Sequence, residues 1–574
     1  MQRAIDRLGT TCYDVVVVGG GIHGACAAWE AALRGLSVAL VDQGDFGAAT
    51  SANSQKIVHG GLRYLQSLDV KRMRESIRER STLLRIAPHL VHPQPFLLPL
   101  HRGSLRHPLV MGAALWLNDV IACDRNRDLT DPSHRIPHGR LLSAAACRRL
   151  VPGLPSSGLA GGALWHDAHI DNTERLTLSF VRSAAEAGAD AANYVQVTGW
   201  RRDGNRISGV AACDVLSGRR LDIRARLVLN TSGPWIDTLP IGGNGHRRAP
   251  EPMAFLKGMV LLTRSLTFQG VAVGLPTRHP NGTTPGLLFM TPWRGCTLVG
   301  TSYRRYTGDP GRCQASPAEI DDFIAEINAA YPAARLKRQD VLAAYVGLVP
   351  AAKGAQAALK HSQLIDHAKR DGIEGLLSVV GVKYTTARDV AEQAIDLALA
   401  KLGAPPRPSR SRTTPLWGGN IERFEAFLDQ ALDDRLWQLP RRVTRHLVSS
   451  YGSAYTDVLK LVRENLVWGE LVAGSNEVLK AEVIHAIRDE MAVTLADVIL
   501  RRTDLAALGD PSSATLEDCA AIMAVELEWD AARIEREVRA VEAERARRGG
   551  WRGALAVPAA TAAPAPVAQE MPAR

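Results

Sequence analysis

The sequence holds 574 residues with a formal net charge of +10, and 46% of them are hydrophobic and 22% charged. This length allows two or three domains with a large core, and the charge favours anionic substrates, cofactors or membrane surfaces as partners. Only 5% of the residues are aromatic and no basic run is interleaved with them, so nucleic acid is not expected as a partner. The eight cysteines include no Cys-x-x-Cys pair, which argues against a zinc site and a redox dithiol.

The chain opens on a predicted strand, a glycine turn, a helix and a second strand. Residues 15–18 are four valines, typical of a strand buried on both faces. Gly19, Gly21 and Gly24 follow as Gly-x-Gly-x-x-Gly, and the second strand ends in Asp42, 21 positions after Gly21. The glycines let the backbone approach a pyrophosphate, the helix N-terminus stabilises its charge, and the carboxylate accepts from a ribose hydroxyl. The sequence therefore predicts a dinucleotide site.

Residues 54–66, SQKIVHGGLRYLQ, place four polar side chains around a pair of glycines. The four are Lys56, His59, Arg63 and Tyr64. One interpretation is a solvated basic face. The other is an anion-binding site at which a base removes a proton, because histidine titrates near neutral pH and arginine offers forked donors.

Strand-like runs alternate with loops from about residue 80 to 380. Residues 225–237 indicate a strand that runs into a Gly-Pro turn, and residues 296–303 a strand that ends in small residues. Residues 376–399 repeat the order strand, glycine turn and helix, with Gly381 at the turn. Such a turn can aim a second helix N-terminus at a cofactor.

A short cluster of histidines and aspartates lies in WHDAHID, where His166 and His169 are three positions apart beside Asp167 and Asp171. These residue types can bind a metal ion. We favour a loop near the substrate domain instead, and we predict no metal site.

The last third of the chain is predicted to be helical. Residues 404–415, APPRPSRSRTTP, are typical of a linker. Apolar residues across 481–503 recur at helical spacing with charges between them, and amphipathic segments continue to about residue 548. The final stretch is rich in alanine and proline, so we expect it to be disordered.

Four motifs together resemble the FAD-dependent glycerol-3-phosphate dehydrogenases. They are ATSANSQKIVHGGLRYL, NTSGPW, GVKYTTARDVAE and RDEMAVTLADVILRRT, and the similarity extends over about residues 12–540. The family implies an α/β (α+β) fold, in which a FAD-binding Rossmann-like domain is interleaved with a mostly antiparallel substrate domain and followed by an all-α domain. We place the interleaved domains at 1–405, a linker at 406–415, the helical domain at 416–548 and a disordered tail at 549–574.

The resemblance also implies a reaction. The secondary alcohol of sn-glycerol 3-phosphate gives a proton to a base and a hydride to flavin N5, which yields dihydroxyacetone phosphate, and the electrons pass to a membrane quinone or to oxygen. His59 is the candidate base. Arg63 is a candidate ligand of the phosphate or the carbonyl oxygen. Lys383 matches a family lysine beside substrate and flavin.

Further site residues follow from the family match. Substrate contacts are predicted at Arg63, Tyr64, Lys257, Lys383 and Thr385. FAD contacts are predicted at Gly19, Gly21, Gly24, Asp42, Ser51, Ser54, Gly233 and Gly381. An ordinary surface loop is the alternative for the two serines.

Four positions depart from the family pattern. At one of them, Val382 replaces a glycine of the family's Gly-Gly-Lys, which is Gly381 to Lys383 here, and the other three departures fall in the substrate half. Val260 stands where the family has a histidine, Val349 where it has an arginine, and Tyr303 where it has an aspartate. Losing the arginine removes two donors to a phosphate, and each charge-assisted bond is worth about 1.5–3 kcal/mol. Candidate replacements are the cations Lys257, Arg294 and Lys353.

Three functions therefore stay open. The first is a glycerol-3-phosphate dehydrogenase with a rearranged phosphate site. The second is a FAD-dependent dehydrogenase or oxidase of another alcohol or amine, which the three departures favour. The third is a flavin-binding protein with little catalysis, and the retention of His59, Arg63 and Lys383 argues against it.

Residues 101–127 contain an apolar stretch of about 15 residues around Trp116, which is too short to span a bilayer. The flanking cations are Arg102, Arg106, Arg125 and Arg127. The segment is either a buried core helix or a helix that lies on an anionic membrane surface, where electrons could reach a quinone. The first strand begins by about residue 14, which leaves no room for a signal peptide. We expect a homo-oligomer in the cytoplasm, or one bound peripherally to the inner face of the cytoplasmic membrane.

Overall fold

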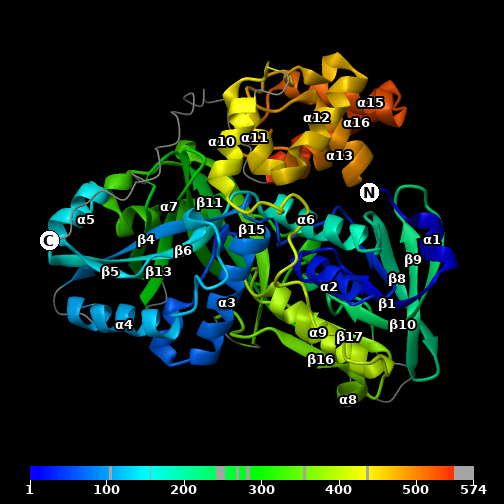
Figure 1. The fold of residues 1–574 in the computed structure, drawn as a ribbon, viewed down its shortest axis with the longest axis horizontal. Helices are drawn as coiled ribbons and strands as arrows, with labels where there is room; N and C mark the ends of the chain where they lie inside the picture. The colour runs from blue at the N-terminus through cyan, green and yellow to red at the C-terminus, as the bar shows by residue number, and fades with distance from the viewer. Residues whose placement is uncertain are drawn as a thin grey trace.

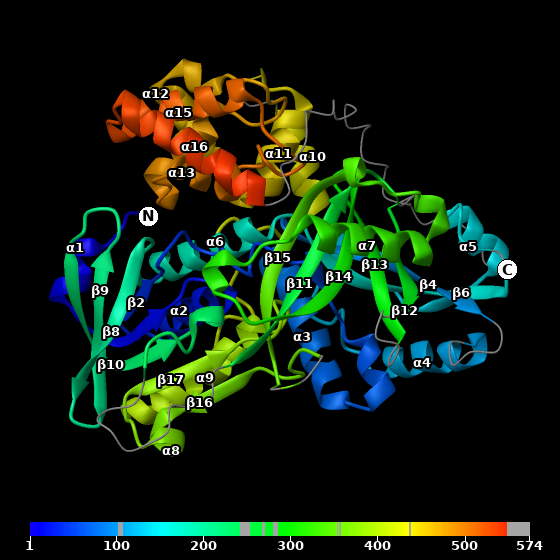
Figure 2. The same cartoon turned by 180° about the vertical axis from the view of Figure 1, so that it is seen from behind.

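Two sheets and a group of C-terminal helices build the fold (Figures 1 and 2). The computed structural model describes residues 1–101, 107–155, 157–240, 253–266, 270–278, 285–352, 354, 357–434 and 438–547. The predicted tail at 549–574 lies outside these residues. The chain alternates between the two sheets before it enters the helical region, which confirms the predicted interleaved α/β fold with a helical C-terminal domain.

The first sheet has eight strands, of which β17, β10, β1, β2 and β7 lie side by side and parallel. Antiparallel β16 flanks β17, and β9 and β8 extend the sheet from β10. The strands are β1 (Cys12–Val18), β2 (Val38–Val41), β7 (Asp190–Ala192), β8 (Val195–Asp203), β9 (Arg206–Asp214), β10 (Arg220–Asn230), β16 (Gln363–Asp366) and β17 (Leu376–Val380). The strands predicted at 225–237 and at the start of 376–399 are confirmed.

Strand β1 separates two apolar cores. Val15 and Val17 pack with helices α2, α6 and α9, whereas Val16 and Val18 pack with β9 and α1. Burial on both faces confirms the strand predicted from the four valines. The helices of this region are α1 (Ile5–Thr10), α2 (Ile22–Leu33), α6 (Thr173–Glu186), α8 (His367–Asp371) and α9 (Ala387–Leu402).

The second sheet has nine strands and is antiparallel except between β4 and β12. Helix α7 inserts Ile320, Phe323 and Ile327 against one face. The strands are β3 (Ile57–Val58), β4 (Val91–His101), β5 (Arg140–Ser143), β6 (Leu159–Ile170), β11 (Ala254–Thr263), β12 (Ala272–Arg278), β13 (Pro285–Trp293), β14 (Cys296–Tyr306) and β15 (Val341–Ala351). The helices are η1 (Leu62–Ser67), α3 (Val70–Ile86), α4 (Pro108–Ile121), α5 (Ala144–Leu150) and α7 (Pro317–Ala330).

The C-terminal helices, yellow to red in Figure 1, lie together above the two sheets in that view. They are α10 (Phe424–Asp434), α11 (Arg441–Tyr451), α12 (Tyr455–Glu464), α13 (Lys480–Glu490), α14 (Leu495–Asp497), the π-helix η10 (Val498–Arg502), α15 (Ser513–Leu527) and α16 (Ala531–Arg547). No helix or strand occurs between α9 and α10, at residues 403–423. The exact domain boundaries stay a prediction.

Residues 481–503 do not form one continuous helix, in contrast to their helical spacing. Met491 adopts a left-handed conformation that ends α13. The carboxylate of Asp497 then accepts from the backbone N–H groups of Val493 and Thr494, each at 2.9 Å, and starts a new helix. Local capping therefore overrides the apolar periodicity.

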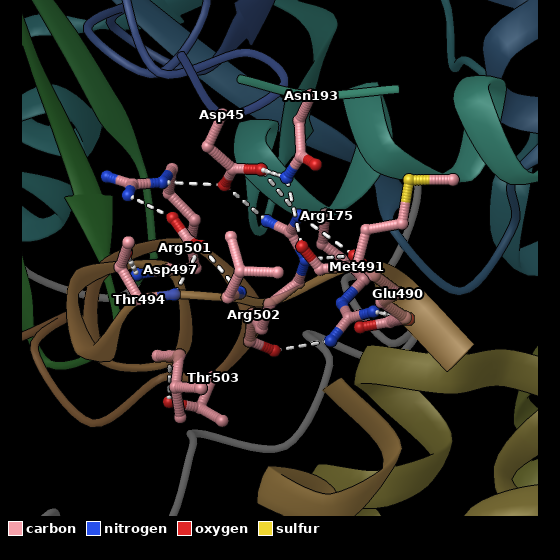
Figure 3. Close-up of polar contacts among 12 residues, drawn as sticks. Asp45, Arg175, Asn193, Glu490, Met491, Thr494, Asp497, Arg501, Arg502 and Thr503 are labelled. Atoms are coloured by element: carbon pink, nitrogen blue, oxygen red, sulfur yellow. Dashed lines mark hydrogen bonds and ion pairs between the residues drawn. The ribbon is translucent and has the colours of Figure 1, made fainter. Parts of the chain in front are cut away.

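Buried ion pairs join this second helical stretch to the first sheet (Figure 3). Asp45, in the loop after β2, accepts from Arg501 Nε at 2.7 Å and from Arg502 Nη1 and Nη2 at 2.7 Å each. Burial alone raises the pKa of Asp45, but the two guanidinium groups lower it to about 2. Arg175 on α6 likewise pairs with Glu490. A charge buried this deeply is costly without its partner, so these contacts hold the helical domain to the loop after β2 and to α6.

Helix α4 lies at the edge of the molecule, at the lower left of Figure 1. Only Leu115 of its residues is buried, so the interpretation of a buried core helix is wrong. Arg125 is buried and pairs with Asp119 at 3.0 Å, whereas Arg127 is exposed. The predicted flanking residues Arg102 and Arg106 lie outside the described residues. Within the described part of the chain, no helix combines the length and the apolarity needed to cross a bilayer.

Candidate active site

Three loops meet at the carboxyl edge of the parallel sheet, because β1, β10 and β17 are parallel neighbours. Gly19 directly follows β1 with φ +101°, and a Cβ there would lie 2.8 Å from the Cα of Ser232 in the loop after β10. A Cβ at Gly24 would lie 1.9 Å from the carbonyl oxygen of Gly19. Only glycine permits both approaches, so the fingerprint glycines pack the turn tightly enough for a backbone-lined phosphate site.

The predicted acidic residue and the first predicted serine face this turn. Asp42 Oδ2 accepts from Gly20 N at 2.6 Å, and burial raises the pKa of Asp42 to about 6. Ser51 Oγ accepts from Ile22 N, the first residue of α2, at 3.0 Å. Ser51 thus lies at the N-terminus of α2 rather than in an unrelated surface loop. An anion would be stabilised at this helix N-terminus. Ser54 Oγ accepts from the backbone N–H of Lys56 at 3.2 Å.

Gly381 and Gly233 complete this edge. A Cβ at Gly381 would lie 2.3 Å from His23 Cε1, so the loop after β17 rests directly on the first turn of α2. Gly233 has φ +58° and open space where its Cβ would be. Burial lowers the pKa of His23 to about 4, and its Nε2 has no hydrogen-bond partner among the described residues. Sequence reasoning missed His23, although it lies inside the glycine fingerprint.

These features fit FAD. The tight glycine turn and the α2 N-terminus suit the pyrophosphate, and Asp42 suits the ribose hydroxyls. The unpaired Nε2 of His23 is a buried polar atom that a ligand at this edge can satisfy. FAD supplies a two-electron acceptor for hydride transfer.

Three cationic side chains lie near Tyr64, which is in η1. We call Arg63, Arg72 and Lys383 the cationic group. The side chain of Arg72 and Lys383 Nζ each lie 4.2 Å from the centre of the Tyr64 ring, and Lys383 also contacts the tyrosine hydroxyl. Burial and the nearby charge of Arg63 lower the pKa of Lys383 to about 8. Arg63 and Lys383 therefore concentrate positive charge next to the loop after β17, as an anion site requires.

His59 lies between β3 and η1, next to the segment that carries Arg63 and Tyr64. Its backbone N–H donates to Thr385 Oγ1 at 3.3 Å, and its ring is 5.9 Å from the Phe289 ring, centre to centre. The side chain is 46% exposed, and its Nδ1 lies 3.4 Å from Asp167 Oδ2. The structure thus brings His59, Thr385 and the cationic group to one region, as predicted from the sequence.

The other predicted cations have different partners. Lys257 Nζ pairs with Glu319 on α7 at 2.5 Å, and Arg294 pairs with Asp504 of the helical domain at 2.7 Å. Lys353 lies outside the described residues. We therefore leave Lys257 out of the proposed site. Arg72, which the sequence analysis did not single out, is the additional cation that the fold supplies.

The three departures of the substrate half lie in the second sheet. Val260 on β11 is buried in an apolar cluster with Trp293 and Tyr345. Val349 on β15 pairs with Leu256. Tyr303 on β14 is 40% exposed and lies close enough to Arg63 for that charge to oppose the rise in its pKa caused by burial. None of these three side chains supplies a cation.

Residues 165–170 of the WHDAHID segment belong to strand β6 and Asp171 follows it, so the expectation of a loop is wrong. Backbone pairing with β4, β5 and β3 holds it inside the sheet. His169 Nδ1 lies 3.4 Å from Asp171, while Asp167 faces His59. Across the described residues, no group of three or more His, Cys, Asp and Glu side chains is placed to hold a metal ion.

Known proteins are similar to this chain in sequence and in fold. Residues 14–384 match the family described as FAD dependent oxidoreductase, and residues 409–534 match the C-terminal domain of alpha-glycerophosphate oxidase. A glycerol-3-phosphate dehydrogenase of Synechocystis sp. is 36% identical over 88% of this chain and 91% of its own length. Glycerol-3-phosphate dehydrogenase 2 of Mycobacterium tuberculosis is 34% identical over 94% of this chain and 89% of its own.

A solved structure shows the same fold over nearly the whole chain. The glycerol-3-phosphate dehydrogenase of Bacillus halodurans complexed with FAD superimposes with a TM-score of 0.75, at 24% identity, over 96% of this chain and 98% of its own. The family match covers the glycine fingerprint, the cationic group and His59, and the second match covers most of the C-terminal helices. The chain therefore belongs to the family of FAD-dependent glycerol-3-phosphate dehydrogenases.

Proposed function

We propose that this protein oxidises the secondary alcohol of sn-glycerol 3-phosphate to dihydroxyacetone phosphate, with FAD as the hydride acceptor. The observation that carries the proposal is the positive charge of Arg63 and Lys383 around Tyr64, next to His59 and the Gly381 loop. A phosphate monoester carries nearly two negative charges. Charge-assisted hydrogen bonds to it are worth about 1.5–3 kcal/mol each.

Each side chain has a distinct proposed role. The planar guanidinium of Arg63 suits bidentate binding of the phosphate, and Lys383 and the Tyr64 hydroxyl add single donors. His59 takes the hydroxyl proton as the carbinol C–H bond loses its electron pair to the acceptor. The remaining C–O bond becomes the carbonyl of the product, so one proton and one hydride leave the substrate.

The test is anaerobic mixing of the FAD-loaded protein with sn-glycerol 3-phosphate, followed by the visible flavin absorbance. Rapid bleaching is expected, with much slower bleaching by glycerol, because glycerol lacks the anion that the cationic group binds. Equal rates with the two donors would contradict a phosphate site. The matched variant Lys257→Met is expected to behave as the parent, because Lys257 pairs with Glu319.

A second candidate is oxidation of a different alcohol or an amine. It is supported by the valines at 260 and 349, which leave apolar side chains where the family has a histidine and an arginine. Absence of bleaching by sn-glycerol 3-phosphate, together with bleaching by an unphosphorylated alcohol or an amine, would favour it. FAD that no donor reduces, but that light reduces normally, would favour a flavin-binding protein with little catalysis.

The electron acceptor is proposed to be a quinone in an anionic membrane, with oxygen as the alternative. Exposed apolar residues along one face of α4 support a membrane-bound acceptor. They are Leu109, Val110, Ala113, Trp116, Leu117 and Val120. Trp116 is 68% exposed. Among the cations predicted around this helix, the exposed Arg127 can contact anionic headgroups, whereas the buried Arg125 is paired with Asp119.

Sedimentation with vesicles that contain phosphatidylglycerol tests this surface. The double variant Trp116→Ser, Leu117→Ser is expected to bind them at least about tenfold more weakly, because each buried apolar side chain contributes about 1.5–3 kcal/mol. The control Leu466→Ser changes a side chain that is 75% exposed in the helical domain and is expected to have no effect. Equal binding of all three proteins would contradict docking through α4. A homo-oligomer stays a prediction, which the molar mass in solution would test.

A further inference from the structure

Asp167 is a buried carboxylate whose two oxygens have different partners. The residue is on β6 and is 4% exposed. Its Oδ1 accepts from Gly60 N at 2.6 Å and from Arg80 Nη1 at 2.7 Å. Its Oδ2 lies 3.4 Å from His59 Nδ1 and 3.4 Å from Trp165 Nε1. One oxygen is therefore fixed to the scaffold, and the other is directed at the histidine.

Arg80 on α3 holds this carboxylate in place. It is 4% exposed, and its Nη1 also donates to the carbonyl oxygen of His166 at 2.9 Å, so it spans α3 and β6. Burial raises the pKa of Asp167, but the hydrogen bond from His59 and the charge of Arg80 lower it to about 2. Asp167 is thus ionised at neutral pH, and a carboxylate in that state can only accept hydrogen bonds.

The glycine pair after His59 is explained by the same contacts. A Cβ at Gly60 would lie 2.1 Å from Arg80 Nη1 and 2.8 Å from Asp167 Oδ1. Any side chain at position 60 would push Asp167 away from the backbone of this loop. The loop that carries His59 is therefore built around the carboxylate.

We infer that Asp167 is the positioning residue of the proposed base: it accepts a hydrogen bond from Nδ1–H of His59 and so leaves Nε2 free to take the substrate's hydroxyl proton. The inference rests on the proposed function. Because an ionised carboxylate accepts only, it selects the tautomer with the proton on Nδ1. It also stabilises the imidazolium that forms when Nε2 gains the proton.

The proton balance is simple. The substrate O–H bond breaks and a new N–H bond forms at His59 Nε2, while the Nδ1–H bond stays intact and Asp167 stays ionised. The hydride leaves carbon for the FAD acceptor in the same oxidation. The charged neighbours of the pair are Arg80 on α3 and, beside Arg80, Arg125, whereas burial lowers the pKa of His166 to about 4 and keeps it neutral.

The first test compares FAD-loaded Asp167→Asn with the parent by anaerobic rapid mixing with sn-glycerol 3-phosphate. An amide can donate to Nδ1 and so favour the wrong tautomer. The rate of flavin bleaching is expected to fall at least about tenfold, which is less than the 10²–10⁴ of a whole general base because His59 itself stays in place. The substrate concentration at half-maximal rate should stay within about threefold, because Asp167 contacts no predicted anion ligand. A parental bleaching rate across the pH range would overturn the inference.

The matched control is Asp171→Asn, which removes a carboxylate just after the same strand. Asp171 lies near His92 and His169, at 3.6 and 3.4 Å, and within the described part of the chain it makes no hydrogen bond or ion pair with His59. Its bleaching rate is expected to match the parent. A loss equal to that of Asp167→Asn would mean that the strand, not the hydrogen bond to His59, sets the rate.

The second test does not depend on activity and separates failure of the inference from failure of the proposed function. Nitrogen-15 NMR of histidine-labelled holoprotein reports the tautomer of each ring, and the His59 signals among the 16 histidines are assigned by their loss in His59→Gln. The parent is expected to show Nδ1–H, and Asp167→Asn a shift towards Nε2–H. A parent with the proton on Nε2 would overturn the inference even if the protein oxidises sn-glycerol 3-phosphate. If His59 has the expected tautomer but sn-glycerol 3-phosphate does not bleach the flavin, only the proposed substrate is contradicted.

Discussion

The two sheets arrange their functional residues by different physical means. At the parallel sheet, the residues that fit FAD follow the carboxyl ends of β1, β2, β10 and β17, and parallel pairing alone brings those ends to one edge. Most of the proposed substrate group instead comes from residues 56–64, a segment with only two residues of strand in β3, and tertiary contacts bring Lys383 to it from the loop after β17. The comparison shows that a cofactor site can be set by sheet topology, whereas this substrate site depends on individual tertiary contacts.

Those contacts hold an irregular backbone. Lys56 and Gly61 both have positive φ angles, of 57° and 85°. Lys56 Nζ pairs with Glu174 on α6 at 3.0 Å, and Gly60 N donates to Asp167 on β6. Since two separate elements hold this segment, a substitution within it should change substrate affinity or reaction rate more than it changes the stability of the fold.

Gly24→Ala is expected to have the largest effect. The new Cβ would lie 1.9 Å from the backbone oxygen of Gly19, which cannot move without opening the turn. We expect FAD affinity to fall at least about a hundredfold, equivalent to about 2.8 kcal/mol, as measured by fluorescence titration of apoprotein with FAD. Gly199→Ala is the control, because nothing lies within 4 Å of a Cβ there. If Gly24→Ala binds FAD as tightly as the parent does, the conclusion that backbone packing forms the FAD site is wrong.

Arg502→Met is expected to weaken FAD binding less than Gly24→Ala does, and to affect FAD binding rather than substrate binding. It leaves Asp45 buried with Arg501 as its remaining guanidinium partner and Asn193 as a neutral donor, and breaking a buried pair typically costs about 3–5 kcal/mol. We expect a lower melting temperature and weaker FAD binding, since Asp45 lies in the loop between Asp42 and Ser51. Arg539→Met removes an exposed pair with Glu535 and should leave the melting temperature nearly unchanged. Unchanged FAD affinity in Arg502→Met would show that the helical domain does not support this loop.

Lys383→Met is expected to affect the substrate half alone. It removes one charge-assisted donor worth about 1.5–3 kcal/mol, so substrate affinity should fall about 10- to 100-fold. FAD affinity should stay near the parental value, because Lys383 lies beyond the Gly381 turn. The substrate concentration at half-maximal bleaching rate measures the effect. Equal weakening of FAD and substrate binding would mean that the two halves are not independent.

The smallest expected effect is a pH dependence of the substrate concentration at half-maximal bleaching rate. The pKa of Lys383 is lowered to about 8, so the side chain is cationic below that pH and loses its charge above it. The half-saturating concentration of sn-glycerol 3-phosphate should therefore rise several-fold as the pH increases through about 8. Lys383→Arg keeps its charge and should remove this rise. A rise that persists in Lys383→Arg would assign the titration to another group.

The sequence by itself determined the parallel-sheet half. The four valines, the glycine spacing and Asp42 are local patterns. They predict a buried strand, a tight turn and an acidic residue at that turn, and the tertiary structure has all three. The strand, turn and helix at 376–399 were predictable for the same reason. The interleaved α/β fold and the FAD family also followed from motifs that are contiguous in the chain.

Only the tertiary structure decided which distant side chains meet. Asp167 is 108 positions from His59, and its segment had the composition of a loop or a metal site, yet pairing with β4 turns it into a strand that faces the histidine. Lys257 and Arg294 had the charge expected of phosphate ligands, but Glu319 and Asp504 neutralise them. The break at Met491 was hidden because helical periodicity records which face is apolar, not where the backbone hydrogen bonds end. Charge and spacing are properties of the chain, whereas the partner of each buried charge is settled only when the sheets and helices pack together.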